Sequence, residues 1–292
     1  MEEMDYQGML RDFKPEHDFF TGIDSDGCVF DSMEVKQKEF FIPDALKYFN
    51  LYGISKILRR TWEFVNLYSV NRGGNRFTSI VKVFELLESN EQVKASGVKL
   101  PAMNSLKEWI RHENRLGNEN LRKYFESHYD PDLEKILRWS ESVNEEISQW
   151  LRDIPPFPNS MKAIKDISSR ADLMIVSQTP LEALEREWKE HDLVKYVRAI
   201  AGQEHGTKSE HLALAAKGKY PDEHILMIGD AKGDLDAAIQ NGVLFFPIMP
   251  GKEDESWKMF TVEGFEKFLN GKFKGAYQEK LIGEFMKYLP ES

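Results

Sequence analysis

The chain has 292 residues, of which 41% are hydrophobic and 30% are charged, so we expect a globular protein of about two domains. Its 39 basic and 49 acidic residues give a net charge of −10, which argues against nucleic-acid or membrane partners. No stretch is apolar for long enough to span a bilayer. The single cysteine, Cys28, excludes an intrachain disulfide, and the acidic N-terminus lacks the features of a secretory signal, so we expect a cytoplasmic protein.

The first predicted element is a short buried strand at residues 19–23. Its apolar run is followed at once by the polar turn Asp24-Ser25-Asp26-Gly27, a pattern typical of a strand that ends in a turn. Two carboxylates therefore lie at the carboxyl end of a strand, which is where parallel sheets bind their ligands.

A helical block follows, from about residue 43 to residue 153. Its apolar side chains recur every three to four positions, which is the period of an amphipathic helix. Examples are Leu46, Phe49, Leu58, Trp62, Ile136, Trp139 and Val143. The prolines of residues 154–158 must end the last helix and stiffen the connection. We therefore predict a helical domain at residues 34–153, inserted into a domain made of residues 1–33 and 154–292.

Beyond this boundary, short apolar runs alternate with amphipathic stretches. The runs predict strands at residues 173–176, 197–201, 225–228 and 243–246. Such alternation is typical of a parallel sheet covered on both faces, as in a Rossmann-like domain. The isolated first strand must complete this sheet, so we predict an α/β fold with an inserted all-helical domain over the active edge. In the tail, residues 251–292, the helix-like spacing of aromatic residues predicts core packing and no chemistry.

More residues that can carry chemistry follow the later strands. Ser177 follows the second predicted strand, Lys208 lies in the loop after the third, and Asp230 and Asp234 come after the fourth. Because the carboxyl ends of parallel strands meet at one edge, we expect these side chains to lie near the carboxylates of the first turn. Each alone also has a structural explanation, since Asp is common in turns and Ser in helix caps.

Together these residues resemble the haloacid dehalogenase-like (HAD) superfamily. Its pattern is a strand then D-x-D-G, a strand then Ser or Thr, a Lys, and a strand then G-D-x-x-x-D, and all four parts occur here in order. The stretch from Asp24 to Ser32 resembles the family's D-x-D-G-T-L-x-D-S, with Cys28 in place of the usual Thr. Ala231 stands where Ser or Thr is common. The resemblance implies a HAD fold with a C1-type cap domain.

The resemblance also implies roles in phosphoryl transfer. Asp24 would be the nucleophile that forms an aspartyl phosphate, and Asp26 would be the general acid and base. In the family this second carboxylate marks phosphate-ester chemistry, because dehalogenases lack it. Ser177 and Lys208 would bind the phosphoryl oxygens against the charge that grows in the transition state.

Several carboxylates at one edge repel one another unless a cation lies among them, and all-oxygen ligands suit Mg²⁺. The resemblance assigns the ligands to Asp24, the backbone carbonyl of Asp26, and Asp230. Asp234, one helical turn later, would orient a ligand or hold a metal-bound water. Magnesium is therefore the expected cofactor.

Three neighbouring residues are interpreted as structural. Thr179 precedes Pro180 and fits a helix N-cap followed by proline at the first helical position. Lys232 is expected at the surface. Cys28 fits a small packing residue better than a reactive thiol.

Within the insertion, residues 71–76 place two glycines between Arg72 and Arg76. One hypothesis is a flexible basic loop that sets substrate specificity, because guanidinium groups pair with carboxylates and phosphates. The alternative, which stays open, is an ordinary turn between helices with exposed arginines.

These observations predict a Mg-dependent phosphatase that hydrolyses a small phosphorylated metabolite through an aspartyl-phosphate intermediate. A phosphomutase of the same superfamily and a non-catalytic phosphometabolite-binding protein remain alternatives. A halide-releasing enzyme is disfavoured by Asp26. The sequence names neither the substrate nor the oligomeric state.

Overall fold

The computed structural model describes residues 5–291; the N-terminal residues 1–4, which enter the prediction that no secretory signal is present, lie outside this range. The chain divides into two compact units. One contains the chain up to Met33 together with Arg152–Pro290, and the other is Glu34–Leu151. Among the described residues, no helix combines the length and the apolar character that a membrane crossing requires.

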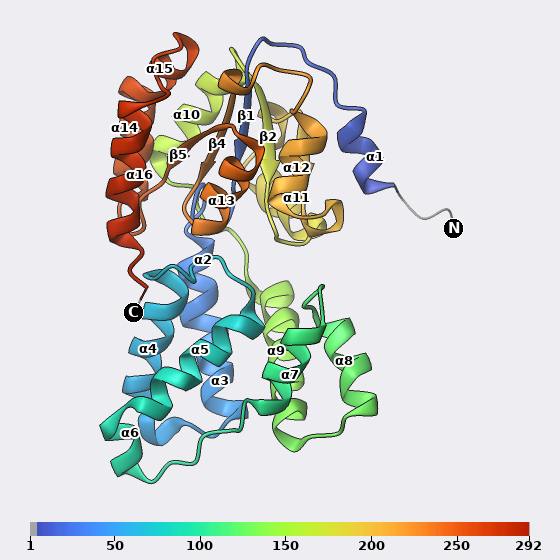
Figure 1. Ribbon diagram of the computed structural model, residues 1–292, viewed down its shortest axis with the longest axis vertical. Coiled ribbons are helices and arrows are strands. Elements are labelled where there is room, and N and C mark those ends of the chain that lie inside the picture. Colours follow the sequence, from blue (N-terminus) through green and yellow to red (C-terminus); the bar gives the residue numbers. More distant parts are fainter. Residues whose placement is uncertain (1–4, 292) are drawn as a thin grey trace. The chain divides into compact units, whose positions relative to one another are not determined.

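The first unit is built on a five-stranded parallel sheet in the order β3-β2-β1-β4-β5 (Figure 1). Its strands are β1 (Phe20–Ile23), β2 (Asp172–Val176), β3 (Ala199–Ala201), β4 (Ile225–Gly229) and β5 (Leu244–Pro247). β1 lies at the centre, where Phe20 is in register with Asp172 on one side and with Ile225 on the other. The first strand completes the sheet, and the α/β class with a helical insertion is confirmed.

Helices cover both faces of this sheet. On one face Ile23 belongs to a buried cluster with Ile164 of α10 (Pro158–Ser168) and Trp257 of α14 (Glu253–Met259). On the other face α12 (Lys208–Ala215) contacts β2, and α13 (Lys232–Asn241) contacts β4 and β5. The other helices of this unit are α1 (Tyr6–Arg11), α11 (Leu181–Glu190), α15 (Phe265–Leu269) and α16 (Ala276–Tyr288).

The tail contributes to the core, as its aromatic spacing predicted. Trp257, Phe260, Phe265 and Phe268 are all buried in the same cluster as the sheet residues. A π-helical turn at Phe260–Gly264 joins α14 to α15.

A buried carboxylate anchors the segment before β1 at the amino edge of the sheet. Asp172 accepts hydrogen bonds from the backbone N–H groups of Glu16 and His17 at 2.8 and 2.9 Å, from Tyr220 Oη at 2.7 Å and from Arg198 Nη1 at 2.6 Å. Burial alone would raise the pKa of Asp172, but the hydrogen bonds hold this pKa below its ordinary value.

In the second unit every regular element is helical. α2 (Ser32–Lys36) crosses the boundary between the units and runs into a π-helical turn at Gln37–Phe41. The helices that follow are α3 (Ile42–Tyr48), α4 (Ser55–Leu67), α5 (Arg76–Ser89), α6 (Glu91–Ser96), α7 (Asn104–His112), α8 (Asn118–Ser127) and α9 (Pro131–Trp150). Their apolar faces form one core around Trp62, Trp109 and Trp139, which is why the helical period is so clear in the sequence.

Candidate active site

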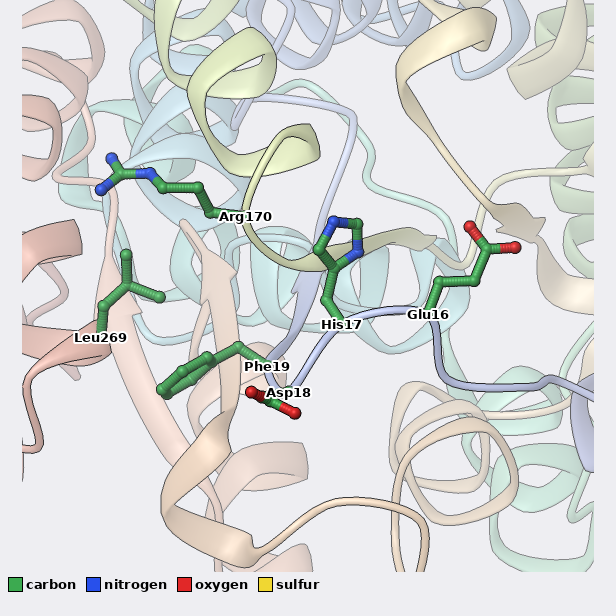
Figure 2. A pocket seen from close by; sticks show the side chains of 6 residues that line it. All are labelled: Glu16, His17, Asp18, Phe19, Arg170 and Leu269. Atoms are coloured by element: carbon green, nitrogen blue, oxygen red, sulfur yellow. The ribbon is translucent and has the colours of Figure 1, made fainter.

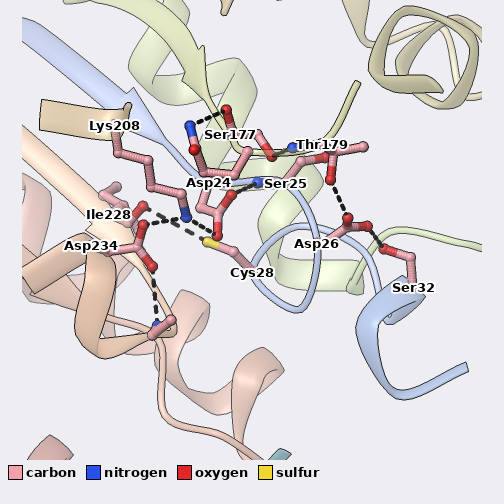
Figure 3. Close-up of polar contacts among 12 residues, drawn as sticks. Asp24, Ser25, Asp26, Cys28, Ser32, Ser177, Thr179, Lys208, Ile228 and Asp234 are labelled. Atoms are coloured by element: carbon pink, nitrogen blue, oxygen red, sulfur yellow. Dashed lines mark hydrogen bonds and ion pairs between the residues drawn. The ribbon is translucent and has the colours of Figure 1, made fainter. Parts of the chain in front are cut away.

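Candidate residues that the sequence predicts for phosphoryl transfer lie at the carboxyl edge of the sheet; Figure 3 shows Asp24, Asp26, Ser177, Lys208 and Asp234. Asp24 follows β1, Ser177 follows β2 and Asp230 follows β4. Lys208 was expected in a loop, but it is the first residue of α12. The helix begins there because Thr207 accepts the backbone N–H of Glu210 in a capping box.

The ammonium group of Lys208 joins two buried carboxylates. Lys208 Nζ lies 2.7 Å from Asp24 Oδ2 and 2.6 Å from Asp234 Oδ1. Asp234 folds back from the first turn of α13, and its carboxylate also accepts the Ala231 N–H at 3.0 Å. A Cβ at Gly229 would lie 2.3 Å from Asp234 Cγ, so only glycine leaves room for this arrangement.

Burial and charge shift the pKa values of this trio. Burial, with the neighbouring charge of Asp234, raises the pKa of Asp24 to about 6 although Lys208 opposes the shift. Burial also raises the pKa of Asp234, again against Lys208. Burial would lower the pKa of Lys208, but the two carboxylates outweigh it and hold this pKa above its ordinary value, so the lysine stays charged.

Three buried carboxylates form a set that fits a divalent cation. Oxygen atoms of Asp24, Asp230 and Asp234 lie within 4.8 Å of one another. Negative charges this close and this buried need nearby positive charge. A hard, all-oxygen donor set is the kind that Mg²⁺ prefers. The donors present therefore fit the expected magnesium.

Asp26 is held by two hydroxyl groups. Thr179 Oγ1 donates to Asp26 Oδ2 at 2.6 Å, and the hydroxyl of Ser32 donates to Asp26 Oδ1. Figure 3 shows this carboxyl group turned away from Lys208. The two hydroxyls come from the loop after β2 and from the start of α2, so they fix the orientation of Asp26 from two sides.

The interpretation of Thr179 as a helix cap is wrong. α11 begins at Leu181, and its N-cap is Pro180. The hydroxyl of Thr179 bonds to Asp26 instead. The sequence did contain a signal for this role of Thr179. It is a second hydroxyl residue, two positions after Ser177, at a strand end where other site residues were expected.

The loop after β2 is tied to the loop that precedes Lys208. The Ser177 N–H donates to the Ala201 carbonyl at 3.0 Å, and Ser177 Oγ accepts the Thr179 N–H at 3.2 Å. Gln178 Nε2 donates to the Gly206 carbonyl at 2.8 Å. These bonds set the Ser177 hydroxyl at a fixed place along the sheet edge.

The turn after β1, residues 24–30, is called here the Asp24 loop. The Ser25 N–H donates to Asp24 Oδ1 at 2.8 Å. The Ser25 carbonyl accepts the N–H groups of Cys28, Val29 and Phe30. Gly27, with a φ of 75°, takes the left-handed conformation that closes this turn.

Cys28 and Lys232, two further residues near the site, have no direct role in the proposed chemistry. Cys28 is buried, and burial raises the pKa of its thiol well above the ordinary value, which disfavours the reactive thiolate. Lys232 Nζ lies 2.6 Å from Asp236, with both side chains 42% exposed.

Both arginines of the insertion have partners within it. Arg72 is buried, and its Nη1 donates to the Leu67 carbonyl at 2.9 Å. Arg76 Nη1 donates to the carbonyl and hydroxyl of Ser140, and its guanidinium lies 4.9 Å from the centre of the Phe41 ring. Because Arg72 is buried, it fits neither a flexible basic loop nor an ordinary turn with exposed arginines. The role of the two arginines in substrate specificity stays a prediction.

A hollow of about 440 Å³ opens at the other edge of the sheet (Figure 2). It is lined by residues that precede β1 and β2 and by one residue of the tail: Glu16, His17, Asp18, Phe19, Arg170 and Leu269. The Arg170 guanidinium is already paired with Asp166 and Glu266. The hollow lies at the opposite end of β1 from Asp24, so it is no part of the carboxylate site.

Comparison with known proteins gives the family of the chain. The family model for haloacid dehalogenase-like hydrolases matches residues 82–248, more than half of the chain although it begins after the Asp24 loop. No curated protein matches the sequence.

Among solved structures, a protein from Bacteroides fragilis described as a haloacid dehalogenase-like hydrolase is 15% identical, with a TM-score of 0.52 over 82% of this chain and 92% of that one. A protein from Lactobacillus delbrueckii subsp. bulgaricus described as a phosphoglycolate phosphatase is 14% identical, with a TM-score of 0.49 over 80% and 87% of the two chains. At 15% identity the likeness to the first of these structures concerns the fold alone. On the family match, the chain belongs to the haloacid dehalogenase-like hydrolases.

Proposed function

We propose that the protein is a magnesium-dependent phosphatase that hydrolyses a small phosphorylated metabolite through an aspartyl phosphate on Asp24. The observation that carries the proposal is the contact of Lys208 Nζ with Asp24 Oδ2 at 2.7 Å. It places a fixed positive charge beside the nucleophile, where the charge on a transferring phosphoryl group must be balanced. Asp26, two residues along the same loop, supplies an acid for the leaving group.

In the first step an oxygen of Asp24 bonds to phosphorus while the ester P–O bond breaks. The leaving oxygen takes its proton from Asp26. In the second step Asp26 takes a proton from water, whose oxygen bonds to phosphorus as the Asp24–phosphorus bond breaks. Lys208 and Ser177 hold the phosphoryl oxygens in both steps.

Magnesium bound by the Asp24, Asp230 and Asp234 carboxylates and the Asp26 carbonyl would supply further charge neutralisation at the phosphoryl group. The fit of the donor set supports this assignment, since three buried carboxylates lie within 4.8 Å. We also propose that residues 34–153 act as the cap domain that selects the substrate. Arg72→Ala and Arg76→Ala are then expected to raise KM while kcat is largely kept, and an unchanged KM in both variants would exclude that role.

The test is phosphate release from sugar phosphates, phosphoglycolate, nucleotides and p-nitrophenyl phosphate, with magnesium and with EDTA. We expect magnesium-dependent release by the wild type and none by Asp24→Asn. Asp236→Asn, which changes a carboxylate of α13 that pairs with Lys232, is the control and should retain activity. Release that persists in Asp24→Asn, or isomerised sugar phosphate in place of free phosphate, would overturn the proposal.

A further inference from the structure

We propose that two buried tryptophans, Trp188 of α11 and Trp257 of α14, are positioning residues that hold the Asp24 loop in its reactive geometry. Trp188 Nε1 donates to Ser25 Oγ at 3.0 Å, and Trp257 Nε1 donates to the Cys28 carbonyl at 2.7 Å. Both side chains are fully buried. The inference rests on the proposed phosphatase function, in which this loop supplies both reacting carboxyl groups.

The bond from Trp188 acts on the residue that orients the nucleophile. Ser25 Oγ accepts the indole N–H and donates to Glu187 Oε2 at 3.3 Å, so α11 holds this side chain through two bonds. The backbone N–H of the same serine donates to Asp24 Oδ1 at 2.8 Å. A shift of Ser25 therefore moves the Asp24 carboxylate.

The bond from Trp257 holds the part of the Asp24 loop that follows Asp26. The Cys28 carbonyl lies in the turn that the Ser25 carbonyl closes. It accepts a hydrogen bond from the Trp257 indole of α14, which comes more than 200 residues later in the chain. A buried carbonyl that loses its donor costs free energy, which the loop can reduce only by moving. Trp257 belongs to the tail, for which the sequence predicted core packing alone. The proposal therefore gives the tail a second role, which is to hold the Asp24 loop in place.

The two sets of residues that handle phosphate respond differently to a loosened loop. Ser177 and Lys208 belong to other segments and still bind the phosphoryl group, whereas Asp24 and Asp26 lose their fixed placement. We expect Trp188→Phe and Trp257→Phe to lower kcat by about tenfold to hundredfold while KM changes by less than about twofold, because small misplacements of reacting groups are costly.

Phenylalanine keeps the aromatic packing and removes only the N–H donor, and a matched control exists. Trp139 is also fully buried, and its Nε1 donates to the Phe41 carbonyl at 3.2 Å within the insertion. Trp139→Phe should leave kcat within about twofold of the wild type. The double variant Trp188→Phe/Ser25→Ala should be no slower than the slower single variant, because both changes remove the same bond.

Amide hydrogen exchange of residues 24–30 gives a readout that needs no substrate. We expect faster exchange at Cys28, Val29 and Phe30 in both loop variants and wild-type exchange in Trp139→Phe. Wild-type exchange in both loop variants, or a kcat loss no larger than that of the control, would overturn the inference. If the wild type releases no phosphate, the proposed function fails, and the exchange result still decides whether the indoles hold the loop.

Discussion

Thr179 donates its hydroxyl to Asp26 across 2.6 Å, although the two residues lie 153 positions apart in the chain. The same threonine donates its backbone N–H to Ser177 Oγ. One residue thus connects the group proposed to bind phosphate with the group proposed to move the proton.

Thr179→Val removes the hydroxyl and keeps the size and branching of the side chain. We expect kcat to fall by about tenfold or more, because general acid catalysis depends on orientation and contributes about 10²-fold to 10⁴-fold. Thr179→Ser should restore most of the activity, which a purely structural role would not require. Thr21→Val, at a buried position in β1, is the control; equal losses in the two valine variants would contradict the prediction.

Lys208→Met should destabilise the protein strongly at pH 7.5, by about 3–5 kcal/mol, because it leaves two buried carboxylates without their cation. Both carboxyl groups have raised pKa values in the folded protein, and losing the lysine raises them further. The folded variant therefore binds protons that the unfolded chain does not, and its deficit should shrink as the pH falls toward 5.

Urea unfolding in EDTA at pH 7.5 and pH 5.0 measures this deficit. Lys232→Met breaks an ion pair whose side chains are 42% exposed, so it should cost less than about 1 kcal/mol at either pH. A Lys208→Met deficit that is equal at the two pH values would count against the charge argument.

Magnesium affinity should depend on pH through Asp24, whose pKa is raised to about 6. A carboxylate must lose its proton before it can bind the metal, so below pH 6 the apparent affinity should weaken by at least about tenfold per pH unit. Titration calorimetry with magnesium chloride alone at pH 7.5, 6 and 5 measures the effect. Asp24→Asn should bind more weakly at pH 7.5 and show a shallower pH dependence, because the raised pKa of Asp234 remains. A wild-type affinity that stays unchanged from pH 7.5 to pH 5 would refute the prediction.

His211 should make the protein less stable in mild acid. Burial, with the charges of His205 and Lys208, lowers the pKa of His211 to about 4, whereas an unfolded histidine titrates near 6.5. Between these values only the unfolded chain binds the proton, so the free energy of unfolding falls as the pH falls. From pH 7.5 to pH 5 this amounts to about 2 kcal/mol.

The difference between wild type and His211→Leu isolates this contribution, because all other groups titrate in both proteins. The variant should lose about 2 kcal/mol less than the wild type over the same interval. A His211→Leu variant with the wild-type dependence would show that the histidine is protonated in the folded state.

The sequence predicts what depends on periodicity and on the geometry of parallel sheets. The alternation of strands and helices is enough to place Asp24, Lys208 and Asp230 at one edge, because parallel strands that follow one another through helices all end on the same side. It does not predict that Thr179 bonds to Asp26 or that Trp257 bonds to Cys28. Those partners lie 153 and 229 positions apart, and a local pattern carries no information on which distant hydroxyl or indole a side chain meets. At Thr179 the local pattern was misleading, because it favoured a helix cap over a contact with Asp26.

The central place of β1 has a consequence for the order in which the protein can assemble. Its neighbours in the sheet, β2 and β4, are synthesised only after the entire insertion. During translation β1 therefore has no strand partners, whereas the insertion, whose core lies within residues 41–147, can fold as soon as it emerges. The strand that directly precedes Asp24 is therefore the part of the sheet that the nascent chain exposes for the longest time before its neighbours exist.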